Sequence, residues 1–409
     1  MKYLFMASCL LAAATALAQG FGGQQSGNDK MEYSEKFADV NYAGDGKGYH
    51  NMDIYLPKEK KDSYPVVIHT YGSAWSMNNY KGSADLNTIC AALLKAGYAV
   101  VTPNHRSASD AIYPAQLHDL KAVVRFVRGN AEKYKFDTSF VAMSGFSSGG
   151  HLSSLVATTC GLTEGKSGSV TVDLVGDLGK FTSFSTCIDG AVLWSPPTDI
   201  YTMNPINNFM GSGTYEGAFI GAEREGNKDK WMVASSPYYA SEDDPPIILF
   251  HGTSDQIVNK EQSQELYDSL KNHNVVTELV SVQGGTHGGS EMYVDENLNK
   301  AITFLNTARE AKAAAVVAPD TGKQDTTVAD TAKTDTVPPG IVYDTLPDAL
   351  PLLRSLGAGP AVSYSVYSLD GALVSRSSVL DKKGLKAGVY YIVETSRTGM
   401  RRTFGYVKR

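Results

Sequence analysis

Short apolar runs alternate with longer amphipathic stretches throughout residues 51–309, and this alternation limits the architectures open to the chain. The apolar runs predict buried strands at 64–70, 98–102, 139–143, 188–194, 246–250 and 275–282. The amphipathic stretches predict helices at 84–96, 114–134, 148–159, 260–273 and 293–311. Strands that alternate with helices form a mainly parallel sheet with helices on both faces, so we predict an α/β domain over residues 37–311.

The first 36 residues differ from this region in composition. Residues 1–18 combine Lys2, a short apolar run and a small-residue cleavage pattern, which predicts a secretory signal peptide and a secreted or cell-surface protein. The run is too short for a good transmembrane segment, and attachment of a lipid at Cys9 is the alternative. Gly, Gln, Ser and Asn are abundant in residues 19–36, which predicts a flexible leader.

The composition changes again after residue 311. Residues 312–350 are rich in Ala, Thr, Asp, Lys and Pro and nearly free of aromatic residues, so we expect a disordered linker. Residues 351–409 regain β character, which predicts a small, basic, β-rich module. Its basic side chains after Asp381 are Lys382, Lys383, Lys386, Arg397, Arg401, Arg402, Lys408 and Arg409.

Charge and cysteine content narrow the function classes. A net charge of −6, without a basic helix in the main region, argues against a nucleic-acid partner. His, Cys and carboxylate residues do not cluster at the spacing of metal ligands, so we expect neither a metal nor another cofactor. Cys160 and Cys187 form a disulfide in one interpretation and are buried thiols in the other. Cys90 lies in an apolar stretch and is expected in the core.

Residues 145–149, Gly-Phe-Ser-Ser-Gly, fit the pattern G-x-S-x-G between a predicted strand and a predicted helix. A serine on such a tight turn has a strained backbone that lifts its hydroxyl above the sheet edge, so Ser147 is the predicted nucleophile. The next N–H group, that of Ser148, is the predicted donor to an oxyanion. An ordinary strand-to-helix loop is the alternative.

A serine nucleophile needs a base and an acid that orients it. Asp255 follows the predicted strand 246–250, and His287 follows the next strand along the chain. Both therefore lie on loops at the sheet edge where ligands bind in open α/β folds, in the order Ser, Asp, His. His69 and His251 end apolar strands, where local hydrogen bonds are the expected role. Asp243 and Asp244 are weaker candidates for the acid, because they precede a strand.

Several segments together resemble one enzyme superfamily. They are Tyr113-Pro114-Ala115-Gln116 with Asp119, the serine turn followed by His151-Leu152, His251-Gly252 with Asp255, and His287. Over residues 50–310 the chain resembles the esterases of the α/β-hydrolase fold that group with bacterial feruloyl and acetyl-xylan esterases, kynurenine formamidases and hormone-sensitive-lipase-like enzymes. The resemblance implies an α/β-hydrolase fold and a serine carboxylesterase without a cofactor.

One segment departs from the family pattern. The family usually has His-Gly-Gly-Gly-Trp after its third strand, and this chain has Tyr71-Gly72-Ser73-Ala74-Trp75. The resemblance implies that the N–H groups of Ser73 and Ala74 complete the oxyanion hole, with Trp75 and Tyr71 beside the substrate. Two lost glycines narrow the accessible backbone conformations, and Tyr71 replaces a histidine that usually braces this loop. A plain loop with Trp75 in the core is the alternative.

The resemblance also implies a substrate class. The C-terminal stretch is similar to sorting or attachment modules of secreted bacterial polysaccharide-degrading enzymes, so we expect contact with the cell surface or the secretion machinery. A basic β tail for acidic surfaces is the alternative. The expected substrates are acetyl or feruloyl esters on xylan-like polysaccharide or small esters, with aromatic residues of 198–237 around the pocket. A prolyl-oligopeptidase-like peptidase and a catalytically silent binding protein are the rival functions.

Overall fold

The computed structural model describes residues 31–81, 85–207 and 213–317, together with five strands between residues 341 and 408. The predicted signal peptide, most of the leader and most of the linker lie outside the described residues. The chain divides into two units, Met1–Arg309 and Glu310–Arg409, and each is described by itself.

An eight-stranded sheet forms the centre of the first unit, in the order β1-β2-β4-β3-β5-β8-β9-β10. Its strands are β1 (Tyr33–Asn41), β2 (Asn51–Pro57), β3 (Tyr64–Thr70), β4 (Ala99–Pro103), β5 (Phe136–Phe146), β8 (Ala191–Trp194), β9 (Ile247–Gly252) and β10 (Thr277–Val282). All neighbours from β4 to β10 pair in parallel, and β2 pairs antiparallel with both β1 and β4. The six parallel strands therefore bring their carboxyl ends to one edge.

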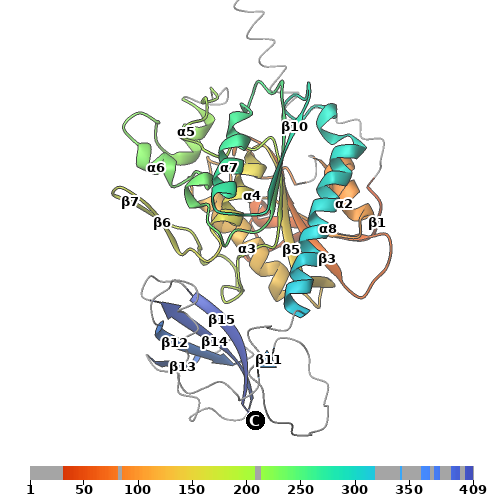
Figure 1. Cartoon of the computed structure of the whole chain (residues 1–409), viewed down its shortest axis with the longest axis vertical. Coiled ribbons are helices and arrows are strands. Elements are labelled where there is room, and N and C mark those ends of the chain that lie inside the picture. Colours follow the sequence, from red (N-terminus) through yellow and green to blue (C-terminus); the bar gives the residue numbers. More distant parts are fainter. Residues whose placement is uncertain are drawn as a thin grey trace, which may run out of the picture. The chain divides into compact units, whose positions relative to one another are not determined.

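Helices cover both faces of this sheet (Figure 1). The principal helices are α2 (Ala91–Lys95), α3 (Ala115–Gly129), α4 (Ser148–Thr158), α7 (Glu261–Asn272) and α8 (Asp295–Val317). One core cluster joins α3, α4 and α7 to strand residues such as Val66 and Ile68, and a second joins α2 and α8 to residues such as Val67. Successive side chains of a strand point to opposite faces, so uniformly apolar strands supply both cores. The predicted parallel α/β fold is confirmed.

A cap segment follows β8 and differs from the layered core. It contains the short helices α5 (Tyr215–Ile220) and α6 (Lys228–Met232) and the single turn Ser236–Tyr239. A two-stranded hairpin, β6 (Glu164–Ser167) with β7 (Val170–Asp173), lies between α4 and β8 in the chain. Further single turns are Gly48–His50, Leu86–Cys90 and Ser290–Tyr293.

The structure moves two predicted boundaries. Strand β1 begins at Tyr33, inside the expected leader. Its residues are mostly exposed and show no apolar pattern, and they form a strand because they pair with the buried strand β2. Helix α8 continues to Val317, past the expected start of the linker at 312, because the run Ala313-Ala314-Ala315 has high helix propensity. The predictions for residues 19–36 and 312–350 are therefore wrong at these ends.

The second unit contains a five-stranded sheet in the order β11-β15-β14-β12-β13. The strands are β11 (Ile341–Val342), β12 (Ala361–Ser368), β13 (Leu373–Ser377), β14 (Gly388–Ser396) and β15 (Arg401–Lys408). Pairing is antiparallel except between β11 and β15. The functional role of this β-rich part stays a prediction.

Two of the described cysteines form a disulfide, and a third is a free thiol. Cys160 and Cys187 form a disulfide with their Cα atoms 4.8 Å apart. Of the two alternatives, a disulfide and two buried thiols, the structure therefore has the disulfide. Cys90 is a free, buried thiol within the core cluster under α2 and α8.

Among the helices of the described residues, none has the length and apolar character needed to span a membrane.

Candidate active site

Ser147 lies in the turn between β5 and α4, at the carboxyl edge of the sheet. Its backbone has φ 52° and ψ −125°, a sparsely populated conformation that costs roughly 1–3 kcal/mol and persists only when neighbours hold it. The N–H of Ser147 donates to the carbonyl of Trp194 at the end of β8, over 2.8 Å. A hydrogen bond from His151 to the Ser147 carbonyl starts the helix. The turn is the strained elbow that the sequence predicts.

The two glycines that flank this turn are required by close backbone contacts. A β-carbon on Gly145 would lie 2.3 Å from the carbonyl oxygen of Gly149. A β-carbon on Gly149 would lie 2.2 Å from the carbonyl oxygen of Thr70, at the end of β3. Any side chain at either position would push the helix away from the sheet, so the small residues of the pattern follow from the fold.

Three side chains from different loops form one hydrogen-bonded chain. Nε2 of His287 lies 2.9 Å from Oγ of Ser147, and Nδ1 of His287 lies 2.8 Å from Oδ2 of Asp255. Asp255 follows β9 and His287 follows β10, so the parallel strands bring both loops to the edge where Ser147 lies. This is the geometry in which a histidine accepts the proton of a serine hydroxyl.

The carboxylate of Asp255 is fully buried and stays charged. Burial on its own raises the pKa of Asp255, but the neighbouring His287 and His251 more than offset this and hold that pKa well below its usual range. Its Oδ1 accepts the N–H groups of Ile257 and Val258 at 2.9 and 3.0 Å. With Oδ1 occupied in this way, Oδ2 faces His287 as an anion that orients the imidazole.

The competing residues have other partners, although His251 also lies 3.4 Å from Oδ2 of Asp255. His251 contacts Oγ of Ser263 at 2.7 Å and the carbonyl of Val258 at 2.9 Å, and His69 contacts Asp85 at 3.0 Å. Asp244 accepts from Ser241, at the amino end of β9 and hence away from the edge that carries Ser147.

The loop after β3 carries the predicted oxyanion donors. Ala74 and Trp75 both have left-handed backbones, with φ of 47° and 57°, so the loop adopts its turn although two family glycines are missing. The N–H of Ser73 donates to Oγ of Ser148 over 2.9 Å, which engages one predicted donor with a protein acceptor. Among the hydrogen bonds of the described residues, none uses the N–H of Ala74 or of Ser148.

Tyr71 and Trp75, predicted to contact substrate, are buried instead, with 2% and 1% of their surfaces exposed. The Tyr71 ring stacks on His105 at 4.8 Å, and its hydroxyl donates to the carbonyl of Met77. The Trp75 ring stacks on Phe219 at 4.7 Å. Both side chains brace the loop from behind, and the tyrosine supplies the bracing ring that the missing histidine provides in the family. The substrate-contact prediction is wrong for this pair.

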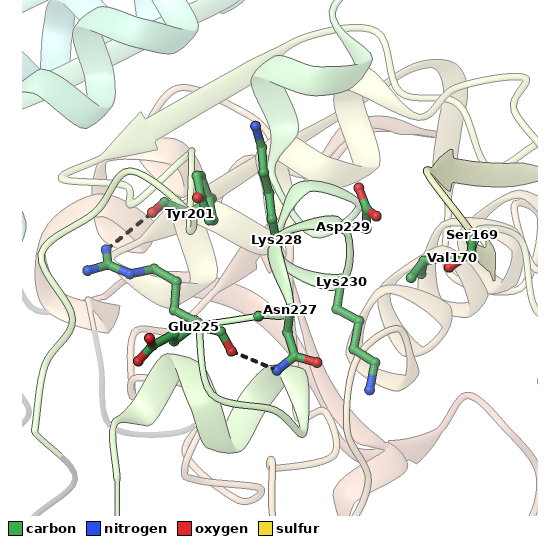
Figure 2. A pocket seen from close by; sticks show the side chains of 10 residues that line it. Ser169, Val170, Tyr201, Glu225, Asn227, Lys228, Asp229 and Lys230 are labelled. Carbon is green, nitrogen blue, oxygen red and sulfur yellow. Dashed lines mark hydrogen bonds between the residues drawn. The ribbon is translucent and has the colours of Figure 1, made fainter.

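The cap segment forms an open, polar pocket of about 620 Å³ (Figure 2). Its lining residues come from the start of β7, from Tyr201 and from the stretch that leads into α6: Ser169, Val170, Tyr201, Arg224, Glu225, Gly226, Asn227, Lys228, Asp229 and Lys230. The Arg224 guanidinium donates to the carbonyl of Tyr201 at 3.2 Å, and the Lys228 ammonium lies 5.5 Å from the Tyr201 ring centre. We expected aromatic residues of 198–237 around the substrate pocket, and Tyr201 is the single aromatic residue that lines this one.

The sequence predicts a structural role for His151, because it lies on a predicted helix, but the local pattern does not show which segments it joins. Nδ1 of His151 accepts from Nε1 of Trp75 at 3.2 Å, and Nε2 donates to the carbonyl of Ala234 at 2.8 Å. His151 therefore connects the oxyanion loop, α4 and the cap.

Comparisons with known proteins identify a family. The BD-FAE family model matches residues 52–270, more than half of the chain. A truncated carbohydrate esterase from gut microbiota is 38% identical with a TM-score of 0.65, over 69% of this chain and 98% of that one. A bifunctional GH43-CE protein of Bacteroides eggerthii is 41% identical with a TM-score of 0.63, over 67% of this chain and 35% of that one.

Among curated proteins, the probable carboxylic ester hydrolase LipM of Mycobacterium tuberculosis is 26% identical over 57% of this chain and 51% of its own length. The chain spans about half the length of the curated relatives it matches. The family match, the parallel sheet and the strained serine turn lead to one assignment. The chain belongs to the BD-FAE family and has the α/β-hydrolase fold.

Proposed function

We propose that the protein is a serine carboxylesterase with Ser147 as nucleophile, His287 as general base and Asp255 as the acid that orients it. The observation that carries this proposal is the unbroken chain from Ser147 to His287 to Asp255, at 2.9 and 2.8 Å. A serine hydroxyl alone is a poor nucleophile, and a neutral imidazole within hydrogen-bond distance is what activates it. The carbohydrate esterase and carboxylic ester hydrolase names of the relatives support the same chemistry.

The chemical steps follow from these positions. Oγ of Ser147 attacks the ester carbonyl carbon as its proton passes to Nε2 of His287, and the carbonyl π electrons move to oxygen. The amides of Ser148 and Ala74 are the N–H groups proposed to stabilise that oxyanion. Collapse of the intermediate expels the alcohol, which takes the proton from His287, and leaves an acyl-enzyme. Water, activated by His287, then attacks the acyl carbon, and the released acid leaves Ser147 with its proton restored.

For the substrate, we propose acetyl or feruloyl esters carried by a xylan-like polysaccharide. The support is a carbohydrate esterase from gut microbiota and a bifunctional GH43-CE protein, 38% and 41% identical to this chain, together with the open pocket beside Tyr201, which none of the triad residues lines. A polar, open pocket with one aromatic ring suits a sugar chain better than a long acyl tail, which needs an apolar tunnel. Tyr201, Asn227 and Lys228 are the side chains proposed to contact the sugar.

We also propose that the protein is exported and works outside the cell or at its surface. Disulfides persist in oxidising compartments and are rare in the cytosol, so the disulfide between Cys160 and Cys187 supports export. The signal peptide at residues 1–18 and a surface or secretion contact through 351–409 belong to the same proposal.

The test is the release of acetate and ferulate from native xylan by the purified protein beside its Ser147→Ala variant. Release of either acid by the wild type alone supports the proposal and identifies the acyl group. Hydrolysis of 4-nitrophenyl acetate without release of either acid from xylan would contradict the proposed polysaccharide substrate but support the esterase activity. Hydrolysis of a peptide amide in place of every ester would favour the peptidase alternative, and activity on neither would favour a binding protein.

A further inference from the structure

Ser148 directly follows the nucleophile, and its hydroxyl contacts the loop that carries the other predicted oxyanion donors. Oγ of Ser148 accepts the N–H of Ser73 over 2.9 Å, and these two residues are 1% and 0% exposed. An N–H group has one hydrogen, so an amide that is already well aligned with one acceptor donates weakly to a second. In the structure, therefore, the Ser73 amide is directed at a side chain.

The hydroxyl hydrogen of Ser148 has no acceptor among the hydrogen bonds of the described residues. A serine hydroxyl accepts and donates at the same time, and a buried donor without an acceptor costs about 1–3 kcal/mol. Ser148 follows Ser147 directly, and Gly72 packs against Ser147 with so little space that a β-carbon on Gly72 would lie 2.8 Å from Cβ of Ser147. The unused hydrogen therefore belongs to the residue that directly follows the nucleophile, on the side chain that binds the loop packed against Ser147.

We propose that the Ser148 hydroxyl is itself an oxyanion donor, which transmits the Ser73 hydrogen bond to the developing negative charge. Accepting the Ser73 N–H polarises the hydroxyl and makes its own hydrogen a stronger donor. The oxyanion then receives the Ser148 N–H, the Ala74 N–H and the Ser148 O–H. This inference rests on the proposed esterase function and adds a catalytic side chain to it.

The experiment compares Ser148→Ala with the wild type on 4-nitrophenyl acetate, after the wild type has been shown to hydrolyse it. Loss of one oxyanion donor typically lowers kcat by about 10²–10³-fold, and the freed Ser73 amide offsets part of this. We expect a fall in kcat of roughly 10- to 100-fold with KM changed by less than about twofold, since the donor acts on the transition state. A kcat that is unchanged or raised would mean that the hydroxyl blocks the Ser73 amide, and would overturn the proposal.

Two further variants separate hydroxyl chemistry from packing. Ser148→Cys fills nearly the same space with a weak donor and acceptor, so it should lose activity as Ser148→Ala does. Recovery in the cysteine variant would show a packing role and contradict the proposal. Ser153→Ala, a buried serine of the same helix whose hydroxyl donates to the Ser144 carbonyl, is the matched control with wild-type kcat. A larger loss in Ser73→Ala than in Ser148→Ala would transfer the role to the Ser73 hydroxyl.

An inhibitor that forms an oxyanion supplies a readout that a structural role would not change. Oγ of Ser147 attacks the carbonyl carbon of a trifluoromethyl ketone, and the resulting adduct resembles the tetrahedral intermediate. Its inhibition constant in Ser148→Ala should rise by the factor by which kcat/KM falls, whereas binding of a product alcohol should stay the same. A rise in the alcohol's dissociation constant by the same factor would overturn the proposal. Failure of the wild type on every ester would instead refute the proposed function itself.

Discussion

Nε1 of Trp75 donates to Nδ1 of His151 over 3.2 Å, at the centre of the contact between the oxyanion loop and the helix that follows the nucleophile. Because Nε2 of His151 donates to the Ala234 carbonyl, the ring carries its proton on Nε2 and accepts on Nδ1. Burial lowers the pKa of His151 to about 4, so the ring is neutral at physiological pH. A neutral imidazole is the only form that can accept from the indole.

We expect His151→Phe to weaken both stability and activity. The substitution keeps an aromatic ring of similar size but leaves the Trp75 N–H and the Ala234 carbonyl buried without partners, at about 1–3 kcal/mol each. Urea unfolding should show a loss of about 2–4 kcal/mol. The value of kcat should fall because the loop that carries Ala74 is loosened. His118→Phe, on α3, is the control, and equal unfolding free energies for the two variants would contradict this role.

Asp255→Asn should lower kcat by about 10⁴-fold while the fold stays intact. Oδ1 accepts the N–H groups of Ile257 and Val258, so the asparagine oxygen takes that place and its NH₂ group faces His287. His287 must then accept on Nδ1 and carry its proton on Nε2, where it cannot take the proton of Ser147. Steady-state hydrolysis of 4-nitrophenyl acetate measures the effect. Asp244→Asn should behave as wild type, and a loss below about tenfold in Asp255→Asn would remove Asp255 from the mechanism.

Substitutions in the cap pocket should affect polymeric and small substrates differently. Tyr201→Ala removes the ring of the pocket, and Lys228→Ala removes the ammonium above it. We expect each to raise KM for acetylated xylan by several-fold, on the order of 1 kcal/mol of lost contact, with little change on 4-nitrophenyl acetate. Lys300→Ala, an exposed lysine of α8 paired with Glu278, is the control. Equal changes on both substrates would mean that the pocket binds no sugar.

Glu216 should make the cap region sensitive to pH. Burial raises its pKa from 4.5 to about 7, although hydrogen bonds from the backbone and the charge of Arg224 partly oppose this. The folded state therefore keeps a proton that the unfolded chain releases, so the contribution of Glu216 to stability is greatest below about pH 4.5 and declines as the pH rises to 7. The decline attributable to this group is on the order of 3 kcal/mol.

The measurement for Glu216 is urea unfolding at pH 5 and pH 8 for the wild type and Glu216→Gln. The glutamine variant should lose less free energy of unfolding between the two pH values, because it cannot ionise. Parallel changes in the two proteins would show that Glu216 does not titrate in this range.

The parts of the fold that sequence predicts are those whose pattern is independent of distant partners. Strand β3 is buried over nearly all of Tyr64–Thr70, has an apolar centre at Val66-Val67-Ile68 and lies at its predicted bounds, because a strand buried on both faces shows its burial in its own residues. Strand β1 carries a mostly exposed pattern, and only its pairing with β2 makes it a strand. The proximity of Ser147, Asp255 and His287 follows from chain order, because parallel strands bring successive loops to one edge.

The contacts of the oxyanion loop could not be predicted from the sequence. The sequence places Ser73 at a donor position, but the contact that engages its N–H comes from Ser148, 75 residues away. Trp75 and Tyr71 occupy positions that face substrate by analogy, yet each finds a closer partner in Phe219 or His105. A 3 Å hydrogen bond or a ring stack between distant segments depends on packing, which no local pattern encodes.

The close backbone contacts at the serine turn have a consequence for the substitutions that the site tolerates. Gly149 touches the carbonyls of Thr70 and Tyr71, and Gly72 touches Ser147 from the other side, so the main chains of the two loops rest directly on each other. The spacing between the nucleophile and the amides of the loop is therefore set by Gly72 and Gly149. Any side chain at Gly72 or Gly149 would separate the two loops and so move the amides of the oxyanion loop away from Ser147.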